Sequence, residues 1–149
     1  EQFNFKLQRK YREIEADEVR YEALMCDDAE YVIIAYGLSA RVSQKSMELA
    51  REKGLKVGLL RPITLYPYPY RAVREVAEKV KGILTVEMSA GQMLEDVRLA
   101  VAERTPVHFY GRMGGMLPSP EEVTTALEDL SNGKTEETFT ELPGIRMIY

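Results

Sequence analysis

The fold of this chain is decided by Glu30-Tyr-Val-Ile-Ile-Ala-Tyr-Gly-Leu-Ser-Ala-Arg41. Residues 31–36 form a nearly continuous apolar run, which is typical of a short strand covered on both faces. Gly37 breaks the run because it adopts backbone angles closed to other residues, and Ser39 is suited to cap the amides of a following helix. The stretch therefore predicts a strand, a tight turn and a helix, and the same unit recurs further along the chain.

Composition is ordinary for a soluble globular protein and excludes several classes. The 149 residues suit one domain with a sizeable core, since 45% are hydrophobic and 30% charged. The net charge of -4 argues against nucleic acid as a partner, and no stretch resembles a signal peptide or a membrane span. A single cysteine, Cys26, and a single histidine, His108, cannot supply a disulfide framework, an iron–sulfur cluster or a His-rich metal site. We expect a cytoplasmic protein without membrane contact, and any redox metal to lie on another chain.

The N-terminal segment predicts an amphipathic helix. Phe3, Leu7, Tyr11 and Ile14 recur at helical spacing among charged residues. We expect this apolar stripe to dock on the domain; the alternative is an inter-domain linker that also touches a neighbouring chain. Residues 15–22 are acid-rich and predict a solvated helical face or linker. Because charged helical sequence begins at Glu1, we expect the C-terminal piece of a longer protein, although methionine removal or trimming explains this start equally well.

Further strand and helix units follow the first. We expect a helix over 39–53, a strand over 56–60, a helix over 70–81, a strand over 83–86, a helix after Gln92, a strand over 106–110 and a helix whose N-cap is Ser119. Prolines make 61–70 a stiff, extended loop. We expect the tail 131–149 to be either a disordered end or an arm on a partner.

Four strands that alternate with helices predict a three-layer α/β/α fold with a mainly parallel sheet. Numbered along the chain, the four predicted strands take the order 2-1-3-4 when the sheet grows outward from the first strand in both directions. A switch point then lies between the first and third strands, and ligands of such sheets bind beyond the carboxyl ends at that point. We expect a crevice there, and its candidate residues are Gly37, Leu38, Ser39, Arg41, Glu87, Ser89, Gly91 and Gln92.

The charges at this crevice are mixed. Helix N-termini and Arg41 attract an anion, whereas Glu87 repels one unless it is paired. The loops match neither a P-loop nor a dinucleotide fingerprint, so we favour a structural or docking role over binding of a small anion or cofactor phosphate. Arg61 and Arg112 leave neighbouring strand ends and are candidates for its border.

Other residues offer weaker chemistry. His108 lies inside a predicted strand without a nucleophile at a recognisable spacing, so we interpret it as structural. Cys26 precedes two aspartates, which raise rather than lower the pKa of a thiol. Three tyrosines in the proline-rich loop predict an interface patch rather than a base-stacking platform, because no basic residues alternate with them. The interface candidates are Arg61, Tyr66, Tyr68, Tyr70 and Arg112.

Four segments together resemble a known family. They are Ala35-Tyr-Gly-Leu-Ser-Ala-Arg41, Gly58-Leu-Leu-Arg-Pro-Ile-Thr-Leu-Tyr-Pro67, Val86-Glu-Met-Ser-Ala-Gly-Gln-Met-Leu-Glu-Asp-Val97 and Tyr110-Gly-Arg112. In this order and spacing they resemble the C-terminal domain of the alpha subunit of 2-oxoacid:ferredoxin oxidoreductases, of the 2-oxoglutarate and branched-chain types. One departure is Ser89, where that family suggests Asn, so a hydrogen bond across the crevice would be shortened or replaced.

The resemblance implies a transketolase C-terminal-like domain at 30–130, preceded by a helical leader or linker at 1–29 and followed by a tail at 131–149. It implies a complex that decarboxylates a 2-oxoacid on thiamine diphosphate with Mg, reduces ferredoxin through iron–sulfur clusters and forms an acyl-CoA. On this reading the chain itself holds none of these cofactors and has no catalytic residue or metal site. Its expected partners are an upstream alpha-subunit domain, a beta subunit and, through the complex, ferredoxin.

Two alternatives stay open. A stand-alone module could bind a small anion or cofactor phosphate at the helix ends that begin at Gly37 and Gly91. The chain could also be the related C-terminal domain of a transketolase or of a 2-oxoacid dehydrogenase beta chain, which shares the Arg-Pro and Thr-Leu-x-Pro loop style. A dimer or higher oligomer is expected in each case, because the aromatic loop, the leader and the tail exceed what a monomer needs to expose.

Overall fold

The computed structural model describes residues 1–134, which contain five helices and five strands. In chain order these are α1 (Gln2–Asp17), β1 (Tyr21–Leu24), β2 (Tyr31–Ala35), α2 (Gly37–Glu52), β3 (Val57–Pro62), α3 (Tyr70–Ala77), β4 (Gly82–Glu87), α4 (Gln92–Val101), β5 (Val107–Gly111) and α5 (Pro120–Ser131). Most of the predicted tail, 135–149, lies outside the described residues.

The sheet has the order β1-β3-β2-β4-β5. Strands β3, β2, β4 and β5 are parallel, and they correspond to the four predicted strands in the predicted relative order. Strand β1 is antiparallel to β3 and extends the sheet by one strand at this edge. The prediction of a mainly parallel α/β sheet is therefore confirmed, whereas its strand count was too low by one.

The missed strand lies where the sequence predicted a helical face or linker. Helix α1 ends at Asp17, and β1 then pairs Tyr21 with Pro62 and Leu24 with Leu59. The strand has only four residues and three of them are exposed, so it lacks the apolar alternation by which a strand is recognised. Its pairing with β3 is a tertiary contact that no local sequence pattern predicts.

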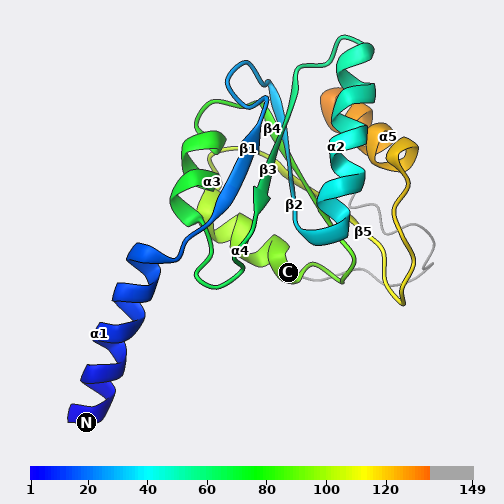
Figure 1. The fold of residues 1–149 in the computed structure, drawn as a ribbon. Helices are drawn as coiled ribbons and strands as arrows, with labels where there is room; N and C mark the ends of the chain where they lie inside the picture. Colours follow the sequence, from blue (N-terminus) through cyan, green and yellow to red (C-terminus); the bar gives the residue numbers. More distant parts are fainter. Residues whose placement is uncertain (135–149) are drawn as a thin grey trace.

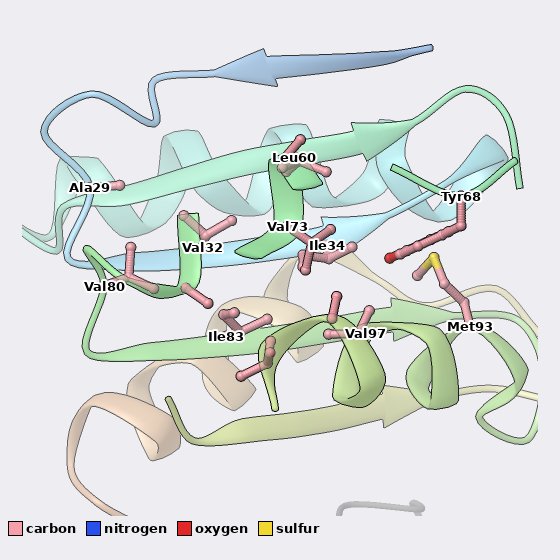
Figure 2. Packing of buried hydrophobic residues seen from close by; sticks show 14 residues of the cluster. Ala29, Val32, Ile34, Leu60, Tyr68, Val73, Val80, Ile83, Met93 and Val97 are labelled. Atoms are coloured by element: carbon pink, nitrogen blue, oxygen red, sulfur yellow. The ribbon is translucent and has the colours of Figure 1, made fainter. Parts of the chain in front are cut away.

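Helices cover both faces of the sheet (Figure 1). On one face, α3 and α4 pack on a cluster that includes Val32, Ile34 and Ile83 (Figure 2). On the other face, α2 and α5 pack on a cluster that includes Ile33 and Leu84. Neighbouring residues of β2 thus enter opposite clusters, which explains why the central strand is apolar throughout.

The observed ends of two elements differ from the predicted ones. Strand β3 continues past the predicted end at Leu60 as far as Pro62, because its last two residues pair with β1. Helix α3 ends at Ala77 rather than at Lys81, and Gly82 is the first residue of β4 instead of a helix stop. The other predicted elements agree with the structure to within about two residues, the usual uncertainty of helix ends.

Helix α1 forms as predicted, but its expected docking on the domain is wrong. No residue of α1 is buried, and Figure 1 shows the helix leading away from the sheet. Phe3 is 69% exposed and Phe5 is 62% exposed. The junction to β1 is nevertheless held, because the amides of Ile63 and Thr64 donate to the carbonyl of Arg20.

Candidate functional site

The residues predicted to line a crevice lie at the edge of the sheet where the parallel strands end, here called the carboxyl edge. Strands β2 and β4 are paired neighbours, and Ala35 at the end of β2 lies opposite Val86 of β4. The loops that leave these two strands therefore emerge side by side, with Gly37 at the start of α2 and Glu87 at the end of β4. This is the switch point of the sheet, because the chain runs to β3 on one side and to β5 on the other.

The entrance to α2 depends on a glycine turn. Tyr36 is the N-cap in an extended conformation, and Gly37 follows with a φ of +56°, which L side chains rarely adopt. The predicted capping role of Ser39 is wrong: the N-cap has no side-chain hydrogen bond, and Ser39 is buried within the first turn of the helix. Leu38 and Arg41 are exposed on the same helix end.

Glu87 is fully buried and accepts three hydrogen bonds at the other loop. The hydroxyl of Ser89 donates to its carboxylate at 2.5 Å, and the amides of Met93 and Leu94 donate to it at 3.1 and 3.2 Å. These amides belong to the first turn of α4, where the helix dipole favours a negative charge. Glu87 therefore caps α4 from inside the domain, and Ser89 bonds to this carboxylate within its own loop.

The same loop is packed tightly against the end of β5. Gly91 is the N-cap of α4 with a φ of +98°, and Gln92 beside it is exposed. A Cβ on Gly111 would lie 2.4 Å from the ring of Phe109 and 2.9 Å from the carbonyl oxygen of Ser89. The loop after β4 thus rests on a strand end that has room only for glycine.

Of the two helix N-termini at the predicted crevice, only that of α2 has backbone amides available to an external anion. At α4, the carboxylate of Glu87 already occupies amides that an external anion would need. At α2, the glycine turn and exposed Arg41 stay available, but a helix end alone is weak evidence for a ligand. Among residues 1–134 no group of three His, Cys, Asp or Glu side chains is placed to hold a metal ion.

The two arginines considered for the crevice border are both engaged in ion pairs. Arg61 lies within β3 and its guanidinium contacts Glu22 of β1 at 3.0 Å. Arg112 donates to the hydroxyl of Tyr110 at 3.2 Å and forms an ion pair with Glu122 of α5. Arg61 thus joins the edge strand to the sheet, while Arg112 joins the exit of β5 to α5.

The three tyrosines of the proline-rich loop have different environments. Only Tyr66 is exposed, at 65%. Tyr68 is 4% exposed and belongs to the core cluster, where Figure 2 shows it near Met93 at the end where the parallel strands stop. Its prediction as an interface residue is therefore wrong, because the loop turns this ring inward.

The third tyrosine, Tyr70, packs edge-on against Tyr68 with ring centroids 5.0 Å apart. Its hydroxyl donates to the carboxylate of Asp96 on α4, and this hydrogen bond, with burial as a smaller cause, raises the pKa of Tyr70 to about 12. Tyr70 thus connects the loop to α4.

From a set of exposed apolar side chains at the carboxyl edge, sequence reasoning named only Leu38 and Tyr66 and missed the other members. They follow β2, β3 and β5 and come from three separate segments of the chain. The signal that could have found them is the presence of large apolar residues inside Gly- and Pro-rich loops. The set is Leu38, Ile63, Leu65, Tyr66, Met113, Met116 and Leu117.

The fold defines a class, the three-layer α/β domains with a mainly parallel sheet, similar to transketolase-like domains. The chain belongs to the family of the pyruvate:ferredoxin oxidoreductase core domain II, whose model matches residues 29–123. A ketoisovalerate oxidoreductase subunit VorB from Methanothermobacter thermautotrophicus is 46% identical over 136 residues, which are 91% of this chain and 38% of that relative. A 2-oxoglutarate synthase subunit KorA from Methanothermobacter marburgensis is 32% identical over 97 residues, which are 65% of this chain and 26% of that relative.

Solved structures show the same fold at low identity. A 2-oxoglutarate:ferredoxin oxidoreductase from Magnetococcus marinus, with 2-oxoglutarate, coenzyme A and succinyl-CoA bound, superimposes with a TM-score of 0.69 at 21% identity, over 79% of this chain and 21% of that one. A split-gene transketolase, an inactive beta4 tetramer, gives 0.65 at 16% identity, over 80% of this chain and 43% of that one. The chain therefore spans less than two fifths of the length of the VorB relative and about a fifth of the solved oxidoreductase chain. Within the described part of the chain, no helix is long and apolar enough to cross a membrane.

Proposed function

We propose that this chain is the assembly domain of a 2-oxoacid:ferredoxin oxidoreductase subunit, of the branched-chain or 2-oxoglutarate type. One observation carries the proposal: a relative named as a ketoisovalerate oxidoreductase subunit matches 91% of this chain, and the match takes up 38% of that relative. An enzyme subunit of this kind thus contains much more than the present fold. The proposed complex oxidises a 2-oxoacid with CoA to an acyl-CoA and carbon dioxide, and transfers the two electrons to ferredoxin.

The surface of the domain supports an assembly role. Large apolar side chains are exposed on three segments at the carboxyl edge; Leu38 at the start of α2 and Tyr66 and Met116 on loops are 47%, 65% and 59% exposed. At the ends of β4 and β5, Glu87 and Arg112 are held by internal contacts rather than directed at a ligand. Rigid loops that present apolar side chains are typical of protein interfaces. The expected partners are an upstream alpha-subunit domain and a beta subunit, which connect the chain to ferredoxin.

The residues of this chain do not fit the metal groups that such a complex uses. An iron–sulfur cluster is held by about four thiolates. Cys26 is the only cysteine, its thiol hydrogen-bonds to the carbonyls of Leu24 and Leu59, and burial is the main cause that raises its pKa. We therefore assign the iron–sulfur clusters, with thiamine diphosphate, Mg and CoA, to other parts of the complex. The chain takes no catalytic step in this proposal.

A segment exchange tests the proposal. The matching segment of the Methanothermobacter thermautotrophicus subunit is replaced by this chain, and the chimera is produced with the remaining subunits of that enzyme. We expect the chimera to co-purify with them and to retain ketoisovalerate-dependent reduction of a viologen dye to within about tenfold, because the proposal takes the two segments, which are 46% identical, to share one docking surface. The matched control carries the equivalent domain of the split-gene transketolase, which shares the fold at 16% identity and should not assemble.

Isolated chain provides the complementary measurement. With thiamine diphosphate, CoA and ferredoxin, the 149-residue chain should show no 2-oxoacid oxidation. Turnover by the isolated chain would contradict the proposal, as would a folded chimera that fails to co-purify. Calorimetric titration with phosphate, CoA and 2-oxoacids addresses the stand-alone binding module, which should bind without a partner. If this chain instead restores activity when it replaces the C-terminal domain of a transketolase, the result would support the alternative that it is a transketolase domain.

The proposal includes a division of the chain and a compartment. Residues 30–130 are the assembly domain, 1–29 lead into it and 131–149 follow it, although β1 from the leading segment completes the sheet. The complex is placed in the cytoplasm, in keeping with the lone cysteine. Limited proteolysis of the chimera checks the division, because cleavage should concentrate near the two proposed boundaries.

A further inference from the structure

Helix α1 has an apolar stripe that the rest of the described chain leaves uncovered. At about 3.6 residues per turn, Phe3, Leu7, Tyr11 and Ile14 share one face of the helix. No residue of α1 is buried, and Phe3 and Tyr11 are 69% and 39% exposed. A stripe of this size needs a partner surface, because isolated helices of about 16 residues are marginal in water.

The charges beside the stripe identify the partner. Lys6, Lys10, Glu13 and Asp17 follow one another at spacings of four, three and four residues, so they form a row along one flank of the stripe. The row is basic in its N-terminal half and acidic in its C-terminal half. Within residues 1–134, none of these four side chains forms an ion pair. Such a row is complementary to a reversed copy of itself.

We propose that two copies of this chain pair through α1 as antiparallel helices about a two-fold axis near Tyr11. A two-fold axis brings the same flank of both helices together, since the interface is isologous. Lys6 then lies opposite the partner's Asp17, and Lys10 lies opposite the partner's Glu13. In the stripe, Leu7 then lies within about two residues of rise, roughly 3 Å, of Ile14 of the partner subunit.

Two further features agree with this orientation. Arg9 and Arg12 lie on the opposite side of α1, so the remaining basic charges do not meet across the axis. Figure 1 shows α1 extending away from the sheet, so antiparallel pairing keeps the two domains at opposite ends of the helix pair. A parallel pair about a two-fold axis along the helices would instead place the charged rows of the two copies on opposite sides of the interface, where they do not meet.

The interface is small, so its strength depends on concentration and salt. Two helices of 16 residues bury less surface than a standard permanent interface, and their flanking ion pairs are screened by salt. The inference does not rest on the proposed function, because α1 precedes the residues 29–123 that match the family model. Either proposal can fail without the other.

A charge-exchange experiment on the 149-residue chain tests the pairing. Sedimentation velocity over a dilution series should show wild-type chain moving from the mass of one chain to that of two. Lys6→Glu with Lys10→Glu makes the whole row acidic, and Glu13→Lys with Asp17→Lys makes it basic. Each double variant alone should associate at least tenfold more weakly, and an equal mixture of the two should form a heterodimer. The matched control, Arg9→Glu with Arg12→Glu, changes the same charge on the opposite face and should still dimerise.

Disulfide trapping detects a weak pair directly. On a Cys26→Ser background, Tyr11→Cys should cross-link to its own copy under mild oxidation, because this position lies at the axis. Arg9→Cys on the far side of the helix should not. Far-UV circular dichroism shows that the variants keep the folded domain.

Three results would overturn the proposal. The first is wild-type chain that sediments as a single chain at every concentration. A single chain that binds phosphatidylglycerol vesicles through α1 counts as the same result. The second is a dimer that persists in both double variants. The third is a mixture of the two variants that fails to associate although wild-type chain does.

Discussion

At the scale of single residues, Glu87 shows how a buried charge closes a loop from inside. The carboxylate is fully buried and accepts hydrogen bonds from Ser89, Met93 and Leu94. Ionised carboxylates are tolerated at a helix N-terminus because amides and the helix dipole stabilise them. The residue that repels an anion on electrostatic grounds is thus the residue that orders the crevice loop.

Replacing Glu87 should destabilise the domain. Glu87→Gln keeps the shape but removes the charge, so the amides of α4 lose charge-assisted hydrogen bonds, and we expect a loss of about 1–3 kcal/mol. The free energy of unfolding in urea measures it. Glu95→Gln on an exposed position of the same helix is the control and should cost at most a few tenths of a kcal/mol. Equal effects of the two changes would show that Glu87 does not cap α4.

Gly111 is a second residue with a measurable consequence. An added Cβ would lie 2.4 Å from the Phe109 ring and 2.9 Å from the Ser89 carbonyl oxygen, and both neighbours are held in the domain. Gly111→Ala should therefore cost about 1–3 kcal/mol of unfolding free energy through overpacking. Met113→Ala, on the exposed loop that follows, should change the thermal midpoint little. An unchanged midpoint for Gly111→Ala would mean that the crevice loop yields easily.

At the scale of elements, α5 is fixed by a capping box that the sequence predicted. The Ser119 hydroxyl accepts from the amide of Glu122, and the Glu122 carboxylate accepts from the amide of Ser119 at 2.8 Å. The hydrogen bond from Ser119 is the main cause that lowers the pKa of Glu122, and the nearby Arg112 adds to it. The cap thereby joins the helix start to the exit of β5.

The cap should give the stability of the domain a dependence on acid pH. Because the folded pKa of Glu122 lies below its unfolded value of about 4.3, its contribution is complete above that pH and is lost as pH falls through the folded pKa. Glu122→Ala should cost about 1 kcal/mol at neutral pH, whereas Glu122→Gln should retain much of the cap. Urea unfolding between about pH 6 and about pH 2 should show a smaller decrease for both variants than for wild type. An unchanged decrease would indicate that other carboxylates dominate.

The helices and strands differed in how well their local sequence predicted them. The start of α5 was readable because Ser119, Pro120 and Glu122 interact within one turn. Strand β1 was not readable, since its four residues are held by pairing with residues of β3 that lie 35 (Leu24 to Leu59) to 41 (Tyr21 to Pro62) positions further on. Tyr68 was misplaced for a related reason: its loop folds back onto α4 and the core, and no periodic pattern records that turn.

At the scale of the whole molecule, the N-terminal segment contains two parts with different roles. Helix α1 has no buried residue, whereas β1 completes the edge of the sheet through pairs such as Ala23 with Leu60. Arg61 adds an ion pair across these strands to Glu22. The strand is therefore part of the folded domain, whereas the helix has no side chain buried in it.

Truncation should separate the two parts. Removal of residues 1–17 should leave the thermal midpoint of dilute monomer within about 2 °C, because no buried side chain is lost. Removal of residues 1–25 should lower it by several degrees, since β3 loses its antiparallel neighbour. Differential scanning calorimetry on both forms provides the comparison. Equal midpoints would show that β1 is dispensable for the fold.

The candidate crevice was predictable in position rather than in chemistry. The order of the parallel strands places Gly37 and Glu87 at neighbouring strand ends, and that order followed from the alternation of apolar runs and helices. Which partner each charge takes did not follow, because Glu87 binds amides six and seven residues further on and Arg61 binds a strand that was not foreseen. Whether the crevice candidates contact another chain stays a prediction.

By itself, the sequence determined the fold class, the parallel strands, their relative order and the capped start of α5. These depend on apolar periodicity and on contacts within a few residues, which a linear sequence displays. Only the tertiary structure decided the antiparallel edge strand, the inward turn of Tyr68, the capping of α4 by Glu87 and the uncovered face of α1. Each depends on whether surfaces distant in the sequence come into contact. The free energy of such contacts comes from packing and desolvation, which a local sequence pattern does not show.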